Sequence, residues 1–151
     1  MFPGSNASLK YGVLGSAHEH AALIVNLNGT KFNFAQPKYM SKSSYIHLEI
    51  YNGILDGSTL HRHATNVPLG EFLKSINMDV SNGCFKTDDN KHYCENKNLK
   101  LSSYVNGNKT KDIMGYVIKD NDRILITYGN QSQSEINLQL QELNNLKINK
   151  L

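Results

Sequence analysis

The side chains best suited to chemistry in this sequence are histidines and one glutamate, arranged in pairs with a single residue between the two members. The pairs are His18/His20, His47/Glu49 and His61/His63. Residues i and i+2 of a β-strand point to the same face, about 6.5–7 Å apart along the strand, so each pair can present two ligands to one cation. Neutral imidazole binds Cu²⁺ and Zn²⁺. The spacing therefore predicts a site for a divalent metal on neighbouring strands.

Copper or zinc is the metal that this ligand set favours. Divalent copper out-competes zinc at imidazole-rich sites, and neither methionine nor cysteine occurs among the predicted ligands to select Cu(I). The competing interpretation is that these histidines are solvated or belong to the core, because one His-x-His pair in a chain with six histidines is unremarkable. Two such pairs and a His-x-Glu pair, all in strand-like contexts in one half of the chain, favour metal binding. His92 stands alone and is predicted to lie on the surface.

The two cysteines suggest a structural disulfide. Cys84 and Cys94 are ten positions apart and flank a turn-rich segment between two short strand candidates, which predicts a disulfide across a β-hairpin. The alternative is a pair of free thiols in a cytosolic protein. There is no Cys-x-x-Cys motif, so a catalytic dithiol is not supported. Because persistent disulfides belong to oxidising compartments, this pair favours an extracellular or cell-surface location.

Short apolar stretches separated by turn residues predict the strands that carry these pairs. We expect strands near residues 17–26, 31–34, 45–50, 58–63, 99–105 and 123–128. Asn28-Gly29 is a strong hairpin signal between the first two strands. The three histidine-containing pairs all fall on or beside expected strands.

Two amphipathic helices complete the predicted domain. The first presents Leu69, Phe72, Leu73 and Ile76 on one face, after Pro68 and with Thr65 or Asn66 as its cap, and the second presents Ile136, Leu140, Leu143 and Leu146 after Ser132 or Ser134. This order predicts an α+β fold, with a single mixed β-sheet packed on a helix and a C-terminal amphipathic helix. Residues 104–128 resemble the second half of a β-grasp fold. The expected divisions are an N-terminal arm or linker (1–15), a metal-binding domain (16–130) and the C-terminal helix (131–151).

Length and charge exclude several function classes. The 151 residues fit one domain with its own core. The formal net charge of +3 is small and dispersed, which argues against a nucleic-acid partner. The longest apolar stretch, residues 21–25, is strand-sized and far below the ~20 residues that a membrane span needs.

Three segments carry a family resemblance: GSAHEHA (15–21), YIHLE (45–49) and LHRHAT (60–65). In this combination the sequence resembles a group of small exported proteins from ammonia-oxidising archaea, often labelled protein-disulfide isomerase. The resemblance extends from about Gly12 to the C-terminal helix. It implies a membrane-anchored domain that faces outward, with an anchor outside this sequence, and it implies no biochemical role for individual residues. The spacing of the cysteines does not support the isomerase label.

Three functions are therefore open. The first is an extracytoplasmic copper- or zinc-binding module. The second, which we favour less, is a metal-dependent hydrolytic enzyme in which Glu19 or Glu49 acts as a base. The third is a self-assembling cell-surface or filament subunit with metal at a subunit contact, in which residues 1–15 add a strand to a neighbouring sheet in a homo-oligomer.

Overall fold

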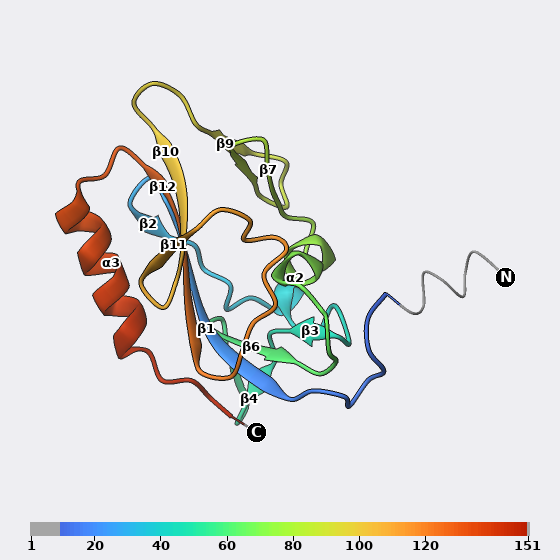
Figure 1. Cartoon of the computed structure of the whole chain (residues 1–151). Helices are drawn as coiled ribbons and strands as arrows, with labels where there is room; N and C mark the ends of the chain where they lie inside the picture. The colour runs from blue at the N-terminus through green and yellow to red at the C-terminus, as the bar shows by residue number, and fades with distance from the viewer. Residues whose placement is uncertain (1–9, 151) are drawn as a thin grey trace, which may run out of the picture.

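A computed structural model describes residues 10–150, which form an α+β fold with a mixed sheet between two helices (Figure 1). The strands are β1 (Glu19–Leu27), β2 (Thr30–Lys31), β3 (Ile46–His47), β4 (Ile50–Tyr51), β5 (Ile54–Leu55), β6 (Thr59–Arg62), β7 (Asp79–Ser81), β8 (Cys84–Lys86), β9 (His92–Cys94), β10 (Lys100–Val105), β11 (Asn108–Thr110) and β12 (Asp122–Gly129). The helical segments are η1 (Pro37–Tyr39), α2 (Leu69–Ser75) and α3 (Gln133–Asn145). The predicted fold class, a mixed sheet packed on a helix with a C-terminal helix, is confirmed.

The main sheet has the strand order β11-β10-β12-β1-β6-β3, and β2 pairs with β1. Its two central strands, β1 and β12, run parallel, whereas β10 and β6 pair antiparallel with them on either side. The apolar residues 21–25 of β1 are buried on both faces, as a central strand requires. The expected likeness to a β-grasp fold is not confirmed and stays a prediction.

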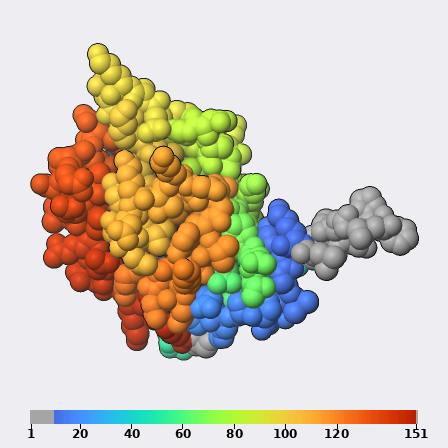
Figure 2. All heavy atoms as spheres, viewed as in Figure 1, coloured from blue at the N-terminus to red at the C-terminus, as the bar shows by residue number. Residues whose placement is uncertain are grey.

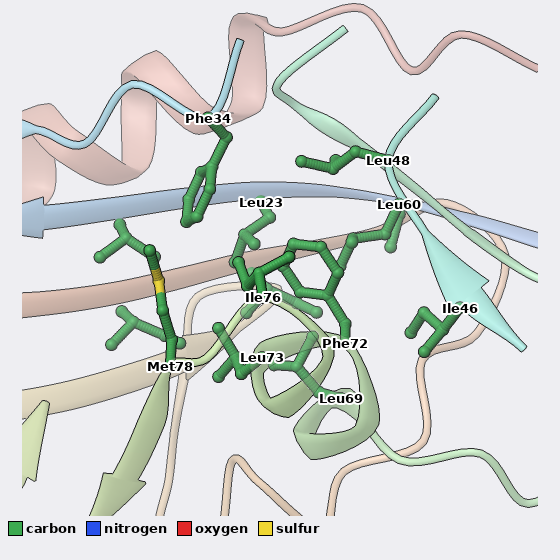
Figure 3. Close-up of a cluster of buried hydrophobic side chains, with 14 of the residues drawn as sticks. Leu23, Phe34, Ile46, Leu48, Leu60, Leu69, Phe72, Leu73, Ile76 and Met78 are labelled. Atoms are coloured by element: carbon green, nitrogen blue, oxygen red, sulfur yellow. The ribbon is translucent and has the colours of Figure 1, made fainter. Parts of the chain in front are cut away.

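Alternate residues of β1 belong to two cores on opposite faces of the sheet. Leu23 packs with Phe72 and Leu73 of α2 in the larger core (Figure 3). Ile24 packs with Leu143 of α3 in the smaller core. Figure 1 shows α2 and α3 on opposite sides of the sheet, so most of β1 has a helix over each of its two faces.

The predicted N-terminal cap is confirmed for α3 and wrong for α2. Ser132 caps α3 as one of the two predicted candidates, in a reciprocal capping box with Glu135. The expected cap of α2 by Thr65 or Asn66 is wrong, because this helix begins at Leu69 after Pro68 and has no side-chain cap. Its first amide groups donate instead to backbone carbonyls of the loop at residues 114–116.

Two predicted strands are shorter than expected. The strand expected at residues 31–34 is reduced to β2, because Phe32 and Phe34 turn in to pack against Tyr39. The strand expected at 45–50 is split into β3 and β4, and Leu48 between them forms a bridge with Met40. The shortened β3 still lies beside β6, which decides where its histidine is placed.

Cys84 and Cys94 form the predicted disulfide, with an S–S distance of 2.07 Å. They are paired across β8 and β9, in a small sheet with β7. The prediction of a disulfide across a hairpin is therefore confirmed.

The predicted arm at residues 1–15 lies partly outside the described residues, which begin at residue 10. The described remainder packs against its own chain. The amide of Gly12 donates to the carbonyl of Thr65 (2.9 Å), and the Tyr11 hydroxyl donates to Glu71 (2.9 Å). Figure 2 shows this blue segment beside the green part of the chain. Pairing of the arm with a neighbouring subunit stays a prediction. Between residues 10 and 150 no helix has the length and apolar character of a membrane span.

Candidate metal centre

The strand order brings the three predicted pairs to one place on the sheet. Strand β6 lies between β1 and β3, and His61 on β6 is directly opposite His20 on β1 and His47 on β3. The i, i+2 spacing then places His18 and His63 on the same face, at the ends of their strands. Five imidazoles from three adjacent strands therefore share one surface of the sheet.

Ring-to-ring distances show that the five imidazoles form one continuous cluster. The centroid of His18 is 4.7 Å from that of His20 and 5.2 Å from that of His63. The centroids of His20 and His61 are 4.9 Å apart, and those of His47 and His63 are 5.0 Å apart. The cluster extends from the interior to the surface: His20 and His61 are buried, His47 and His63 half-buried, and His18 exposed.

Glu49 reaches into the cluster from the short segment between β3 and β4. Its Oε2 lies 3.2 Å from Nε2 of His47, and its Oε1 lies 3.6 Å from Nε2 of His61. Among the described residues, His47, Glu49 and His63 form a group whose ligand atoms all lie within 4.8 Å of one another. These three side chains are therefore the part of the cluster closest to a coordination geometry.

The protonation of His47 follows from its backbone contact. Its Nδ1 lies 2.7 Å from the carbonyl oxygen of Ser43. A carbonyl oxygen only accepts, so Nδ1 carries a proton, and Nε2 of the neutral ring offers its lone pair to Glu49. An imidazole lone pair and a carboxylate oxygen repel each other at this distance. A proton or a cation must therefore lie between His47 and Glu49.

His20 has the same arrangement with a carboxylate in place of the carbonyl. Its Nδ1 lies 3.2 Å from Oδ1 of Asp120, which also accepts a hydrogen bond from the His20 amide (2.8 Å). A hydrogen bond from Lys150 is the main reason that the pKa of Asp120 is lowered to about 2, so the carboxylate is ionised and accepts from Nδ1. In the neutral ring this contact leaves Nε2 of His20 as an acceptor, and Nε2 is buried without a hydrogen-bond partner among the described residues.

Burial keeps the deepest imidazole neutral. Desolvation lowers the pKa of His61 to about 4, against a partly compensating attraction to Glu49. Desolvation also lowers the pKa of His63, and the neighbouring histidines add to the effect. Metal ligation requires unprotonated imidazole, so these two rings are in the binding-competent state at neutral pH.

The residues between the paired ligands point to the opposite face. Arg62 is buried there and donates to the carbonyls of Ile118 and Ala64, which fixes β6 to the loop before β12. Glu19 pairs in register with Arg62 and so lies away from the imidazoles, which contradicts its predicted role as a base at this site. His92 is exposed on β9, as predicted.

Asp120 and Ser43 are site residues that the sequence did not reveal. Asp120 stands in an Asp-Asn-Asp turn that indicates a strand entry and nothing more. Each of these residues contacts one imidazole through Nδ1 and leaves Nε2 for other contacts, with Glu49 in the case of His47. Outer contacts of this kind orient metal-ligating histidines in many proteins.

Comparisons of this chain with protein-family models, with curated proteins and with solved structures gave no match. The resemblance to exported archaeal proteins therefore stays a prediction, and the function has to be argued from the site.

Proposed function

We propose that this protein is a binding domain for a divalent transition metal, copper or zinc, held by the cluster of His18, His20, His47, Glu49, His61 and His63. The observation that carries the proposal is the 3.2 Å contact between Nε2 of His47 and Oε2 of Glu49. In the neutral ring both atoms are acceptors, because the single proton of His47 then lies on Nδ1 beside the carbonyl oxygen of Ser43. A cation between them turns this repulsion into two coordinate bonds.

The surroundings of the cluster support a metal rather than a proton as the bridging charge. Nε2 of His20 and of His61 are buried without hydrogen-bond partners among residues 10–150, which is costly unless something binds them. Nitrogen and oxygen donors of this kind suit Zn²⁺ and Cu²⁺. A single proton on His47 would satisfy one contact and leave the two buried nitrogen atoms unpaired.

A location outside the cytoplasm is part of the proposal. The disulfide between Cys84 and Cys94 fits an oxidising compartment, and the resemblance to exported, anchored proteins has the same implication. In such a compartment the module would take up metal that reaches the cell surface.

Hydrolytic catalysis is the second candidate, since His47, Glu49 and His63 leave a fourth position for water. The two predicted bases argue against it. Glu19 lies on the opposite face of the sheet, and Glu49 is needed as a ligand. Binding therefore accounts for the described geometry better than catalysis does.

The test is metal binding by protein purified without a histidine tag and stripped with EDTA. Calorimetric titration with Cu²⁺ or Zn²⁺ and elemental analysis after gel filtration should show at least one equivalent per chain. The variant His47→Ala/His63→Ala should lose the metal equivalent bound by these two histidines, whereas the matched control His92→Ala, which removes an exposed histidine from β9, should bind as much metal as the wild type. Far-UV circular dichroism checks that both variants fold. Equal binding by the double variant and the wild type would place the metal elsewhere and refute the proposal.

A further inference from the structure

We propose that the cluster holds two divalent cations side by side, with the carboxylate of Glu49 bridging them. This inference rests on the proposed metal-binding function. The first cation would be bound by His47, His63 and Oε2 of Glu49. The second would be bound by His20, His61 and Oε1 of Glu49, with the exposed His18 at the rim. The sequence predicts the ligands but leaves the number of metals open.

One metal ion cannot use all the donors that the sheet brings together. A zinc ion takes four ligands at about 2.0–2.2 Å, so donors to the same ion lie within about 4 Å of one another. Five imidazoles and a carboxylate offer six donor groups. Among the described residues, His47, Glu49 and His63 are the one group whose ligand atoms all lie within 4.8 Å of one another. The ligand atoms of His20, His61 and Glu49 would have to move closer together, by rotation of their side chains, to hold a second ion. His20 and His61 are left over, deeper in the sheet.

These two left-over histidines are the ones with unsatisfied nitrogen atoms. His20 is 4% and His61 1% exposed, and Nε2 of each is buried without a hydrogen-bond partner among the described residues. Their rings are neighbours across β1 and β6, in an edge-to-face arrangement with centroids 4.9 Å apart. Asp120 holds the proton of His20 at Nδ1, so the lone pair on Nε2 is free to bind. A cation at the first position alone would leave both atoms unpaired, whereas a second cation between these rings satisfies both.

Glu49 lies between the two positions. Its oxygens diverge toward imidazoles on different strands, Oε2 toward His47 on β3 (3.2 Å) and Oε1 toward His61 on β6 (3.6 Å). A carboxylate that presents one oxygen to each of two ligand sets is the arrangement that bridges a pair of metal ions. The same carboxylate also offsets part of the repulsion between two dications in a half-buried site.

Titration of the EDTA-stripped, untagged protein with Cu²⁺ tests the inference, with binding followed by calorimetry and by electron paramagnetic resonance. Two equivalents should bind per chain. At full loading, magnetic coupling should reduce the signal below that of two isolated Cu²⁺ ions. His92→Gln, the control outside the cluster, should behave in the same way.

Three variants divide the site. Glu49→Gln keeps the size of the side chain but removes its charge and one of its two metal-binding oxygens, and should weaken binding of the second equivalent and abolish the coupling. His20→Gln should leave one equivalent at His47 and His63, and His47→Gln/His63→Gln should leave one equivalent at His20 and His61. Circular dichroism checks each fold, and His20→Gln is chosen because His61 is the more deeply buried.

The two proposals fail in different ways. A single equivalent in the wild type, unchanged in affinity by His20→Gln, would overturn the second cation and leave the metal-binding function intact. Two equivalents with the full, uncoupled signal would overturn the bridge. No binding at all would overturn both proposals.

Discussion

Replacing Asp120 should weaken metal binding although this residue is not a proposed ligand. Oδ1 of Asp120 accepts from both the amide (2.8 Å) and Nδ1 (3.2 Å) of His20. These contacts fix the plane of the imidazole and direct Nε2 into the cluster. In Asp120→Ala the ring is free to rotate and to place a proton on Nε2, so part of the binding free energy must be spent on restoring the competent state.

The size of the effect follows from the contacts. Loss of an outer partner of a metal-ligating histidine costs about 10–100-fold in affinity, or about 1.4–2.8 kcal/mol. The lower half of this range applies here, because the side chain of Asp120 is 38% exposed and that of Lys150, its other partner, 42% exposed, so solvent screens the charge. We expect about a tenfold loss for Asp120→Ala. Asp120→Asn keeps an acceptor for Nδ1 and should lose less.

Calorimetric titration of the stripped variants with Zn²⁺ measures this loss, on the equivalent that uses His20. Lys150→Ala is the matched control, because it removes the exposed ion pair but leaves the contact between Asp120 and His20 intact. Its affinity should stay within about threefold of the wild type. Wild-type affinity in a folded Asp120→Ala protein would refute the orienting role. An equal loss of metal affinity in Lys150→Ala would mean that the C-terminal segment, and not the contact between Asp120 and His20 alone, orients the imidazole.

Three further predictions concern stability and are measured by urea unfolding of EDTA-treated protein. Replacing Cys84 and Cys94 by Ser should lower the free energy of unfolding by about 2.5–3 kcal/mol, since the closed loop is short, and an unchanged midpoint would contradict this. Because burial lowers the pKa of His61 from 6.5 to about 4, the unfolded chain binds the proton more readily, and up to about 3 kcal/mol of stability should be lost as the pH falls from 6.5 to 4. His61→Gln should flatten that pH dependence, and an equally steep loss in this variant would place the titration elsewhere. Arg62→Met leaves the buried carbonyl of Ile118 without its donor and should cost about 3 kcal/mol, whereas a cost below about 1 kcal/mol would mean that water replaces the guanidinium.

The shared face of each His-x-His or His-x-Glu pair could be predicted from the sequence because its geometry is local. In any strand, His61 and His63 share a face, and the alternation of the backbone guarantees it. The disulfide is local in the same sense, since a turn of the right length brings Cys84 opposite Cys94. These predictions require only the spacing of residues and the recognition of a strand.

The pairing of strands could not be predicted in the same way. Nothing in the spacing places β6 between β1 and β3, and this order depends on which apolar faces are buried together in the core. Asp120 shows the difficulty most clearly, because it lies 100 positions from His20. The two meet because β12 runs parallel to β1, which puts the turn entering β12 beside the start of β1, where the amide of Asn121 donates to the carbonyl of His20.

The same strand explains why the cluster lies at the edge of a rigid core. On one face of β1, Ala22 and Ile24 lie under α3, whereas His20 lies on that face beyond the apolar cluster that this helix forms. On the reverse face, Leu60 and Ile46, which neighbour the ligands on β6 and β3, are fully buried in the larger core. The larger core therefore holds the backbone of β1, β3 and β6 in place, and only rotation of the side chains could adjust the cluster to a metal. If the cluster binds metal as proposed, the backbone of the site is in place before the ion arrives, so a preference between copper and zinc would come from the number and direction of the imidazoles.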